Sequence, residues 1–351
     1  MTDLIHYIAL SLLPSWSWLP IAERLRAGDL PAAVFDRLMA RHWPDDPHHR
    51  SDVYARARAA IDRGQTRRIA PIAWNNPVYP VALTTIADPP PVLWMQGSSA
   101  AFDRPAVAIV GARAASAYGL SVAERLAADL AARGLAIVSG LARGVDSAAH
   151  RGALSAGGVT LGIMGSGVDV VYPPEHASLA RDMQQDGGVV SELVPGTPPL
   201  KQFFPMRNRI ISGLSRAVVV IEAGEKSGSL ITARCALEQG RDVLAVPGNV
   251  LSGRNRGAHA LLKDGAKIVE SADDILEELR MPPAACASTC GEPASLNQDP
   301  ILACLTPGEP SDLDAIAERS GLTTARLLPR LFELELQGAV ARVGGGRFVR
   351  V

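Results

Sequence analysis

The sequence predicts an α/β protein built around a doubly wound, mostly parallel sheet, with a small helical domain before the sheet and a winged-helix domain after it. From about residue 106 onward, short runs of β-branched and other apolar residues alternate with helical stretches rich in Ala and Leu, which is typical of βαβ units. Most runs are uninterrupted apolar, as expected of strands buried on both faces. The length of 351 residues fits two or three domains at roughly 150 residues each.

The first part of the chain, residues 4 to about 62, carries apolar residues at helical spacing. Five prolines divide this pattern into short helices; they are Pro14, Pro20, Pro31, Pro44 and Pro47. Trp16, Trp18 and Trp43 stand among these helices. We interpret them as core residues, because aromatic side chains of a small helical module more often fill its interior than form a contact surface.

Seven apolar runs are predicted to form the strands of the sheet: residues 106–110, 135–138, 159–164, 189–191, 217–221, 242–246 and 267–269. Before them lies a proline-rich segment from about residue 71 to residue 97, which contains Tyr79-Pro80 and Pro89-Pro90-Pro91. Proline supplies no hydrogen-bond donor to a strand ladder. This segment is therefore excluded from the centre of the sheet and is expected at its edge.

The last part of the chain predicts a linker and a third module. Residues 282–300 hold four prolines among Ala, Ser, Thr and Gly, which favours a flexible linker. Residues 301–351 predict a short helix, a helix over 312–319, a break at Gly321, a helix over 323–337 and a hairpin over 339–351, the pattern of a winged helix. Pro329 falls inside the third helix and removes a backbone donor there, so the pattern does not fix where that helix starts.

Composition and charge restrict the class of protein. Hydrophobic residues make up 47% and charged residues 20%, which indicates a globular protein instead of a disordered chain. The 35 basic and 36 acidic residues give a net charge of -1. Any polyanionic partner must therefore be held by local positive patches.

The cysteines and the N-terminus indicate the compartment. Four scattered cysteines, Cys235, Cys286, Cys290 and Cys304, are too few for a disulfide framework and favour a reducing environment. No second Cys/His pair follows Cys286 and Cys290 at zinc-ligand spacing, so we expect neither a structural metal nor a cofactor. The N-terminus lacks a signal-peptide pattern, and no apolar run reaches the roughly 18 residues of a membrane span. We expect a cytoplasmic protein that does not contact a membrane.

Small residues follow nearly every predicted strand. These loops are Gly111-Ala112-Arg113, Ser139-Gly140, Gly165-Ser166-Gly167, residues 224–229 and Pro247-Gly248-Asn249. One such loop is explained by the tight turn that glycine permits, but five at the carboxyl edge of one parallel sheet favour anion binding there. They match neither the dinucleotide fingerprint nor the P-loop, because no third glycine opens a helix after Gly167 and Lys226 does not follow a second glycine.

A basic and aromatic stretch gives the sharpest local signal. From Lys201 to Arg216 there are four basic residues and no acidic residue, with Phe203 and Phe204 among them. Basic side chains neutralise phosphates and aromatic rings stack on unpaired bases, so the stretch predicts contact with single-stranded nucleic acid. The alternative is a solvated charged loop.

Two further motifs have a structural and a functional interpretation. Ser227-Gly228-Ser229 predicts a helix N-terminus whose hydroxyls and amides either hold another phosphate or form an ordinary cap. Asp146 and His150 share a helix face at i,i+4 spacing. Because no nucleophile accompanies them, we interpret Asp146 as an N-cap and the pair as structural. The sequence therefore predicts a binding site more readily than a catalytic one.

Several of these motifs occur together, in a fixed order. They are Tyr79-Pro80, residues 90–93, Val110-Gly111-Ala112-Arg113 with Ser116, residues 139–146 with Ala149-His150, Phe204-Pro205 with residues 207–215, residues 227–233 and residues 240–248. This series resembles the DNA-processing protein A (DprA, also called Smf) family of bacterial single-strand binders. The likeness covers about 200 residues, from residue 79 to residue 275.

The resemblance implies a non-catalytic protein that binds single-stranded DNA, protects it after uptake and loads the recombinase RecA during natural transformation. It implies a helical domain of SAM or helix-hairpin type over 1–65, an extended Rossmann-like DNA-binding domain over 66–281, a linker over 282–300 and a winged helix over 301–351. It also implies a homodimer formed near residues 258–262 and 267–269.

The resemblance and the residue patterns together predict the DNA-binding residues. By motif position, Arg113 and Lys201 would contact phosphates, Phe204 would stack on a base, and Arg209 would line the same pocket. Ala112 stands where many members carry Thr, so one hydroxyl contact to an anion is missing. The full predicted set is Gly111, Arg113, Ser116, Ser139, Gly140, Gly165, Ser166, Lys201, Phe204, Arg207, Asn208, Arg209, Ser227, Gly228, Ser229 and Thr232.

Two alternatives stay open. The first is a phosphoribohydrolase of the lysine-decarboxylase-like kind, whose motif Pro-Gly-Gly-x-Gly-Thr-x-x-Glu aligns with residues 227–235 but places Cys235 where the hydrolase needs a carboxylate. The second is an adaptor that binds only proteins. Arg326 and Arg330 of the third winged-helix helix alternate with Glu333 and Glu335, so that helix is a poor duplex reader and we favour a protein-contact or auxiliary role for the module.

Overall fold

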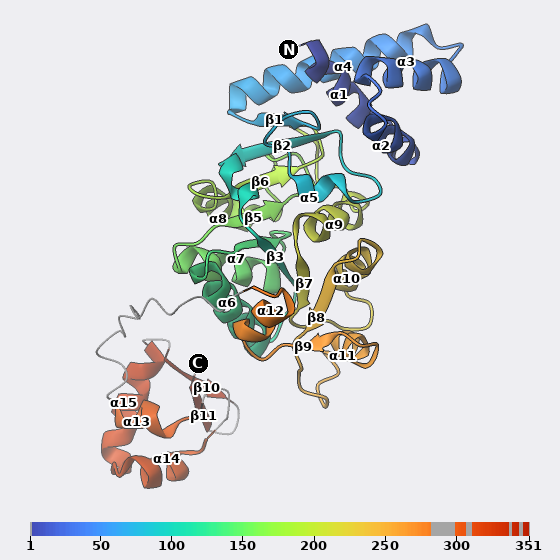
Figure 1. The fold of residues 1–351 in the computed structure, drawn as a ribbon. Helices are drawn as coiled ribbons and strands as arrows, with labels where there is room; N and C mark the ends of the chain where they lie inside the picture. Colours follow the sequence, from blue (N-terminus) through green and yellow to red (C-terminus); the bar gives the residue numbers. More distant parts are fainter. Residues whose placement is uncertain (1, 282–298, 307–310, 337–338, 344–346, 351) are drawn as a thin grey trace. The chain divides into compact units, whose positions relative to one another are not determined.

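The computed structural model describes residues 2–281, 299–306, 311–336, 339–343 and 347–350. The chain divides into two compact units, Met1–Pro283 and Ala284–Val351, and each is described by itself (Figure 1). The predicted linker at 282–300 lies almost wholly outside the described residues.

The first unit is built on a nine-stranded sheet whose order is β1-β2-β6-β5-β4-β3-β7-β8-β9. Strands β3 to β9 pair in parallel, and β1 and β2 join antiparallel beside β6. All seven predicted runs are strands, and the proline-rich segment supplies β1 and β2 at one edge, as predicted. The strands are β1 (Ala70–Ala73), β2 (Val92–Gly97), β3 (Ala106–Val110), β4 (Ala136–Ser139), β5 (Thr160–Ile163), β6 (Gly188–Ser191), β7 (Ala217–Val220), β8 (Asp242–Ala245) and β9 (Lys267–Ile268).

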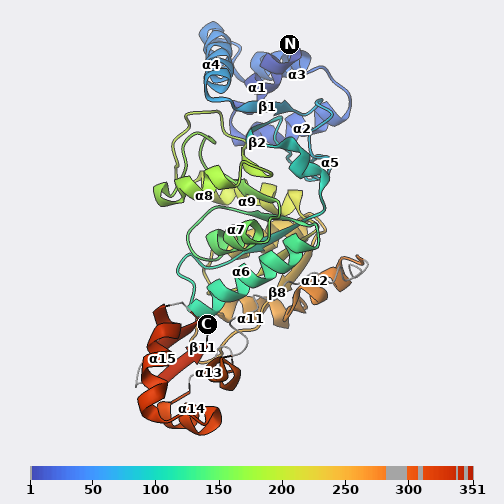
Figure 2. The ribbon, with the colours of Figure 1, turned by 90° about the vertical axis from the view of Figure 1, so that its left-hand side faces the viewer.

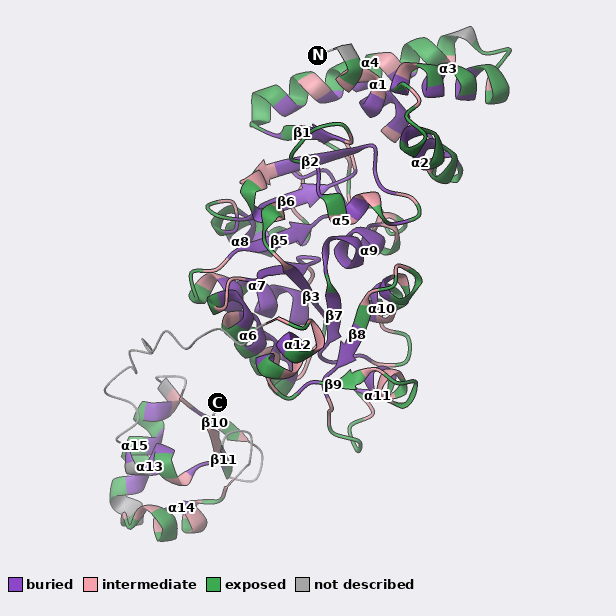
Figure 3. Ribbon diagram, in the orientation of Figure 1, coloured by how far each residue is buried: buried purple, intermediate pink, exposed green. Residues whose placement is uncertain are grey.

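Helices cover both faces of this sheet, and the central strand β3 shows why. Ala106, Ala108 and Val110 pack with α5, α9 and α10 on one face, while Val107 and Ile109 pack with α6, α7 and α12 on the other. A strand buried on both faces reads as continuously apolar, and Figure 3 shows β3 and β7 buried along their length. The helices are α5 (Val81–Thr84), α6 (Ala117–Ala132), α7 (Val145–Ser155), α8 (Ala177–Asp182), α9 (Phe203–Leu214), α10 (Ser229–Glu238), α11 (Arg256–Lys263) and α12 (Ala272–Glu278), with the 3-10 turns η2 (Ser99–Asp103) and η3 (Pro174–His176).

The N-terminal helices pack directly on the β1 end of the sheet (Figures 1 and 2). They are α1 (Thr2–Ser11), the turn η1 (Ser15–Ser17), α2 (Trp18–Arg26), α3 (Pro31–His42) and α4 (Pro47–Arg67), and the prolines at the starts of α3 and α4 begin them as predicted. One apolar cluster joins Ile8 and Phe35 of the helices to Trp94 and Val189 of the sheet. Residues 1–65 and the sheet therefore share a core within one compact unit.

The interpretation of the three tryptophans as core residues is wrong for Trp16, which is 51% exposed. Trp18 and Trp43 are half-buried, and the Arg209 guanidinium lies 4.8 Å from the Trp18 ring centroid. The fully buried tryptophan is Trp94 of β2, because β2 is covered by the N-terminal helices. Within the described residues, no single helix is long and apolar enough to cross a membrane; one pair, Asp3–Ser11 and Ser15–Arg26, meets the length and composition test only together and is bent by 120°.

The second unit has the predicted helix-helix-helix-hairpin order. Its elements are α13 (Pro300–Cys304), α14 (Leu313–Ser320), α15 (Thr324–Leu336), β10 (Val340–Val343) and β11 (Arg347–Arg350). Ile301, Ile316, Leu331 and Phe348 meet in its core. Gly321 ends α14 in the left-handed conformation, and α15 continues through Pro329.

Candidate functional site

The sheet reverses its direction of winding at β3. The chain passes from β3 to β4, β5 and β6 on one side, and then returns to place β7 on the other side of β3. In open α/β sheets, ligands bind outside the carboxyl ends of the strands at such a switch point. A cavity of about 870 Å³ lies there, lined by residues 110–113, Ala142, Asp146, Tyr172, Pro199, Lys201, Phe204, Pro205, Arg207, Asn208, Ile211, Gly224, residues 226–229, Ile231 and Thr232.

The cavity brings together most of the predicted DNA-binding residues. Ten of them line it: Gly111, Arg113, Lys201, Phe204, Arg207, Asn208, Ser227, Gly228, Ser229 and Thr232. Six do not: Ser116, Ser139, Gly140, Gly165, Ser166 and Arg209. The first group comes from the loops after β3, β6 and β7, from the first two turns of α9 and from the first turn of α10, which converge only when the sheet forms.

The mouth of the cavity is cationic and aromatic. Arg113, Lys201 and Lys226 are exposed and line the cavity. The Arg113 guanidinium lies 5.7 Å from the centroid of the Phe204 ring, and the rings of Tyr172 and Phe204 have centroids 5.5 Å apart at an interplanar angle of 52°. Among the described lining residues the only acid is Asp146, which is buried. The cavity therefore offers positive charge beside two aromatic rings.

Arg207 forms the floor beneath these groups. Its Nη1 donates to the carbonyl oxygens of Gly140, at 2.7 Å, and of Ile163, and its Nε donates to Asn208 Oδ1 at 3.1 Å. Burial lowers the pKa of Arg207 to about 10, and the Asp146 carboxylate opposes this shift. The side chain is 5% exposed. Arg207 thus ties the ends of β4 and β5 together and presents little of its charge at the surface.

The opposite wall is polar and formed by the start of α10. The Ser227 and Ser229 hydroxyls are 2.7 Å apart, and Asn208 Nδ2 donates to the Gly228 carbonyl at 3.3 Å. Gly228 is the N-cap residue and has no side chain to cap the helix, and the Ser227 hydroxyl accepts from the Ser229 amide at 3.4 Å. Thr232 lies one turn further, on the same side, and is 2% exposed. This wall can offer hydroxyl groups to an anion at a helix N-terminus.

The residues outside the cavity support its walls. Ser139 Oγ donates to the Ile109 carbonyl and Ser166 Oγ to the Val170 carbonyl. Ser116 caps α6 and donates to Glu222. A Cβ on Gly165 would lie 2.9 Å from the Phe204 ring, and a Cβ on Gly140 would collide with the Arg207 guanidinium. These two glycines are thus small because functional side chains pack against them.

Arg209 lies away from the predicted pocket. Its guanidinium forms ion pairs with Glu192 at 2.7 Å and with Asp88 at 2.9 Å, and the residue is 8% exposed. Although burial disfavours the cation, the two carboxylates raise the pKa of Arg209 above its usual value. Arg207 and Arg209 are two positions apart on α9, so they point to different sides of the helix. The helical periodicity of the sequence could have shown that Arg207 and Arg209 lie on different sides of α9. It does not show which of the two faces the cavity.

Asp146 is not the N-cap of its helix, contrary to the sequence interpretation. Gly144, with φ 77°, takes that position, and the Asp146 carboxylate accepts from the amides of Gly140 and Ala142 at 3.1 and 3.3 Å. His150 instead contacts Thr160 Oγ1 at 2.6 Å through Nδ1. Asp146 thus holds the loop after β4, and the two side chains bond to different partners.

Tyr172 and Lys226 were missed by the sequence analysis. Tyr172 follows the Gly165-Ser166-Gly167 loop, and Lys226 directly precedes Ser227. An aromatic or basic residue within a few positions of a strand-end glycine loop is the signal that could have identified both. Within the described ranges, no group of three or more His, Cys, Asp or Glu side chains could hold a metal ion.

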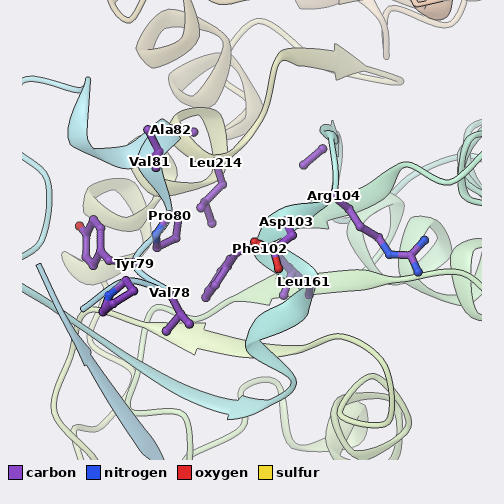
Figure 4. Close-up of a pocket in the computed structure, with 13 residues that line it drawn as sticks. Val78, Tyr79, Pro80, Val81, Ala82, Phe102, Asp103, Arg104, Leu161 and Leu214 are labelled. Atoms are coloured by element: carbon purple, nitrogen blue, oxygen red, sulfur yellow. The ribbon is translucent and has the colours of Figure 1, made fainter. Parts of the chain in front are cut away.

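A second, smaller cavity of about 170 Å³ lies near the amino end of β3, away from the carboxyl ends of the strands where the first cavity lies. Figure 4 shows Tyr79, Pro80 and Val81 facing Phe102 and Leu214 across it. Ala106, the first residue of β3, also lines it. None of the predicted site residues is part of this lining.

The comparisons with known proteins agree on one family. The family described as DNA recombination-mediator protein A matches residues 70–280, and the DprA winged helix domain matches residues 291–346. Protein Smf of Escherichia coli is 42% identical over 286 residues, covering 79% of this chain and 76% of that protein.

Two solved structures are also similar to this chain. DNA processing protein A from Streptococcus pneumoniae is similar with a TM-score of 0.68 and 37% identity, covering 78% of this chain and 96% of that chain. DNA processing protein A from Helicobacter pylori, whose structure is described as showing a unique single-stranded DNA binding mode, is similar with a TM-score of 0.55 and 29% identity, covering 60% of this chain and 95% of that chain.

Proposed function

The chain belongs to the DNA recombination-mediator protein A family, and from this premise we propose that it binds single-stranded DNA in the cavity at the β3/β7 switch point. The observation that carries the proposal is the mouth of that cavity, where Arg113, Lys201 and Lys226 surround the rings of Phe204 and Tyr172. Phosphates need the cations and unpaired bases need the rings. A duplex hides its base faces, so the single strand is the preferred form.

Each part of the cavity has a role in this proposal. Arg113 and Lys201 contact phosphates, and Phe204 and Tyr172 stack on bases. The hydroxyl wall of Ser227, Ser229 and Thr232 receives a further phosphate. Arg207 positions these groups from below, since its Nη1 is already bound to two carbonyl oxygens and its Nε to the Asn208 side chain.

The test is a titration of labelled dT oligonucleotide and of its duplex at several salt concentrations. Three exposed cations predict that the logarithm of the binding constant falls with the logarithm of the salt concentration with a slope of about -2 for the single strand. The single strand should bind more tightly than the duplex. Lys201→Ala and Arg113→Ala should each weaken binding, whereas Arg234→Ala, an exposed cation of α10 outside the cavity, should not. Equal binding by the cavity variants and the wild type would reject the proposal.

We further propose that the protein acts without catalysis, protects incoming strands and loads RecA during natural transformation. Membership of the family supports this role. The aligned position of the hydrolase carboxylate is Cys235, which lies on α10 outside the cavity lining. RecA filaments should assemble faster on single strands with the wild type than with Lys201→Ala. Release of ribose 5-phosphate from a nucleoside monophosphate would contradict the non-catalytic role.

We also propose that the chain forms a homodimer through α11 and β9. Strand β9 is one of the two edge strands of the sheet, and its Ile268 is 55% exposed. An exposed apolar residue on an open edge favours pairing with another chain. Sedimentation of the wild type as a dimer, and of Ile268→Asp as a monomer, is the expected result.

A further inference from the structure

The last helix of the N-terminal segment, α4, is strongly basic. From Pro47 to Arg68 the sequence holds six arginines and two aspartates, and the outer side of the helix is exposed (Figure 3). Arg56, Arg58 and Arg67 are exposed, and their guanidinium groups have no ion pair or hydrogen bond within the described part of the chain. Such unpaired cations are available to a polyanion.

Helical spacing divides these arginines between two flanks. Arg56, Arg63 and Arg67 are separated by seven and four residues, so they lie along one flank of α4. Arg58 lies two residues from Arg56 and therefore points to another side. Asp52 precedes Arg56 by four residues on the first flank, and its negative charge lowers the positive potential at that end of the flank.

One contact fixes which way the first flank faces. Arg63 Nε donates to Asp169 Oδ2 at 2.7 Å, and the Asp169 side chain is 2% exposed. The other Asp169 oxygen accepts from the Gly196 amide at 2.7 Å. Arg63 thus meets two loops at once, the loop after β5 and the loop after β6.

The same two loops continue into the DNA cavity. Tyr172 stands three residues after Asp169, and Lys201 stands five residues after Gly196, and both line the cavity. In Figure 2 the loops between β5 and α8 and between β6 and α9 lie below the end of α4. The flank of Arg56, Arg63 and Arg67 therefore adjoins the Tyr172 and Lys201 side of the cavity.

We propose that this flank of α4 extends the single-strand path, so that a strand leaving the cavity past Tyr172 and Lys201 reaches α4 at Arg63 and continues along the flank formed by Arg56, Arg63 and Arg67. The inference rests on the proposed function of the cavity. Without aromatic side chains on this flank, the contacts are to phosphates and independent of sequence. The N-terminal helices thus lengthen the binding site.

The test compares oligonucleotide lengths. Wild type, Arg56→Gln/Arg67→Gln and the matched control Arg58→Gln are titrated with dT oligonucleotides from about 4 to about 16 nucleotides, the range of typical single-strand sites. The shortest strands, which fill only the cavity, should bind all three proteins equally. Longer strands should bind the double variant about tenfold more weakly at low salt, with a log–log slope shallower by about 1.4 for two lost phosphate contacts. Arg58→Gln should match the wild type at every length.

Other outcomes overturn the inference in distinguishable ways. Equal affinity of the double variant for long strands would remove the flank from the DNA path. A loss that is the same for short and long strands would indicate a damaged cavity, which the circular dichroism melting curve of the variant checks. A loss confined to duplex would assign the flank to double-stranded DNA. If the wild type binds no strand of any length, the proposed function itself fails, and this inference with it.

Discussion

The Arg113 guanidinium lies 5.7 Å from the centroid of the Phe204 ring, although the two residues are 91 positions apart in the chain. Arg113 follows β3 and Phe204 lies in the first turn of α9, so the contact exists only because the sheet brings β3 beside the start of that helix. Tyr172 packs on the same ring. A base stacked on Phe204 would thus have a cation within reach of its phosphate.

Replacing the aromatic ring and replacing the cation should have different signatures. Phe204→Ala should weaken single-strand affinity by about 1–3 kcal/mol, the contribution of one stacked base, with little change in the salt slope. Lys201→Ala should instead make the log–log slope shallower by about 0.7. Fluorescence anisotropy at several salt concentrations separates the two. Phe203→Ala, next in sequence but outside the cavity, is the matched control and should keep its affinity.

Gly140→Ala should destabilise the protein, because a Cβ there collides with the Arg207 guanidinium. Overpacking of this kind costs about 1–3 kcal/mol, and displacement of Arg207 should also lower DNA affinity. Gly228→Ala has open space around the added carbon and should leave stability nearly unchanged. Urea unfolding of both variants measures the difference, and equal stability would show that Arg207 can move at no cost.

Arg209→Ala should reduce stability without reducing the affinity of the folded protein for DNA. Removing the cation leaves the buried Glu192 carboxylate without its partner, which costs about 3–5 kcal/mol. Burial already raises the pKa of Glu192, and the variant raises it further. A carboxyl whose folded-state pKa exceeds its unfolded value loses stability as pH rises. The loss of stability in Arg209→Ala should therefore be larger at pH 8 than at pH 5. A loss of DNA affinity in the folded variant would place Arg209 on the DNA path.

His150 should make the protein less stable in acid. Burial lowers the pKa of His150 from 6.5 to about 3, so the folded state keeps the neutral ring while the unfolded chain takes up a proton. The free energy of unfolding should fall as pH decreases from about 6.5 towards 3. His150→Asn removes the imidazole that takes up this proton. The unfolding free energy of the variant should therefore depend less steeply on pH between about 6.5 and 3. Parallel pH profiles for the two proteins would contradict the assignment.

Removal of the second unit should leave single-strand binding intact. The cavity and the α4 flank lie within Met1–Pro283, which is a compact unit of its own. A chain ending at residue 281 should therefore bind dT oligonucleotide with the affinity and salt slope of the full chain. A large loss of affinity would show that the winged helix contributes directly to the DNA site.

The sequence by itself determined the strands, the edge position of the proline-rich segment and the winged-helix order. These follow from local properties: apolar runs, the missing donor of proline and the breaks at glycine. It also identified ten residues of the cavity, because loops after parallel strands must meet at one edge. Tyr172 and Lys226 fell outside the prediction, although each stands within a few positions of a strand-end glycine loop.

Only the tertiary structure decided which polar residues face the ligand and which support the fold. Arg207 and Arg209 are alike in sequence, yet one lies under the cavity and the other is held by Glu192 and Asp88, which come from distant parts of the chain. The contact of Arg63 with Asp169, 106 positions away, likewise exists only in the folded chain. Charge pairing between distant segments depends on which surfaces meet in space, and no local pattern encodes that.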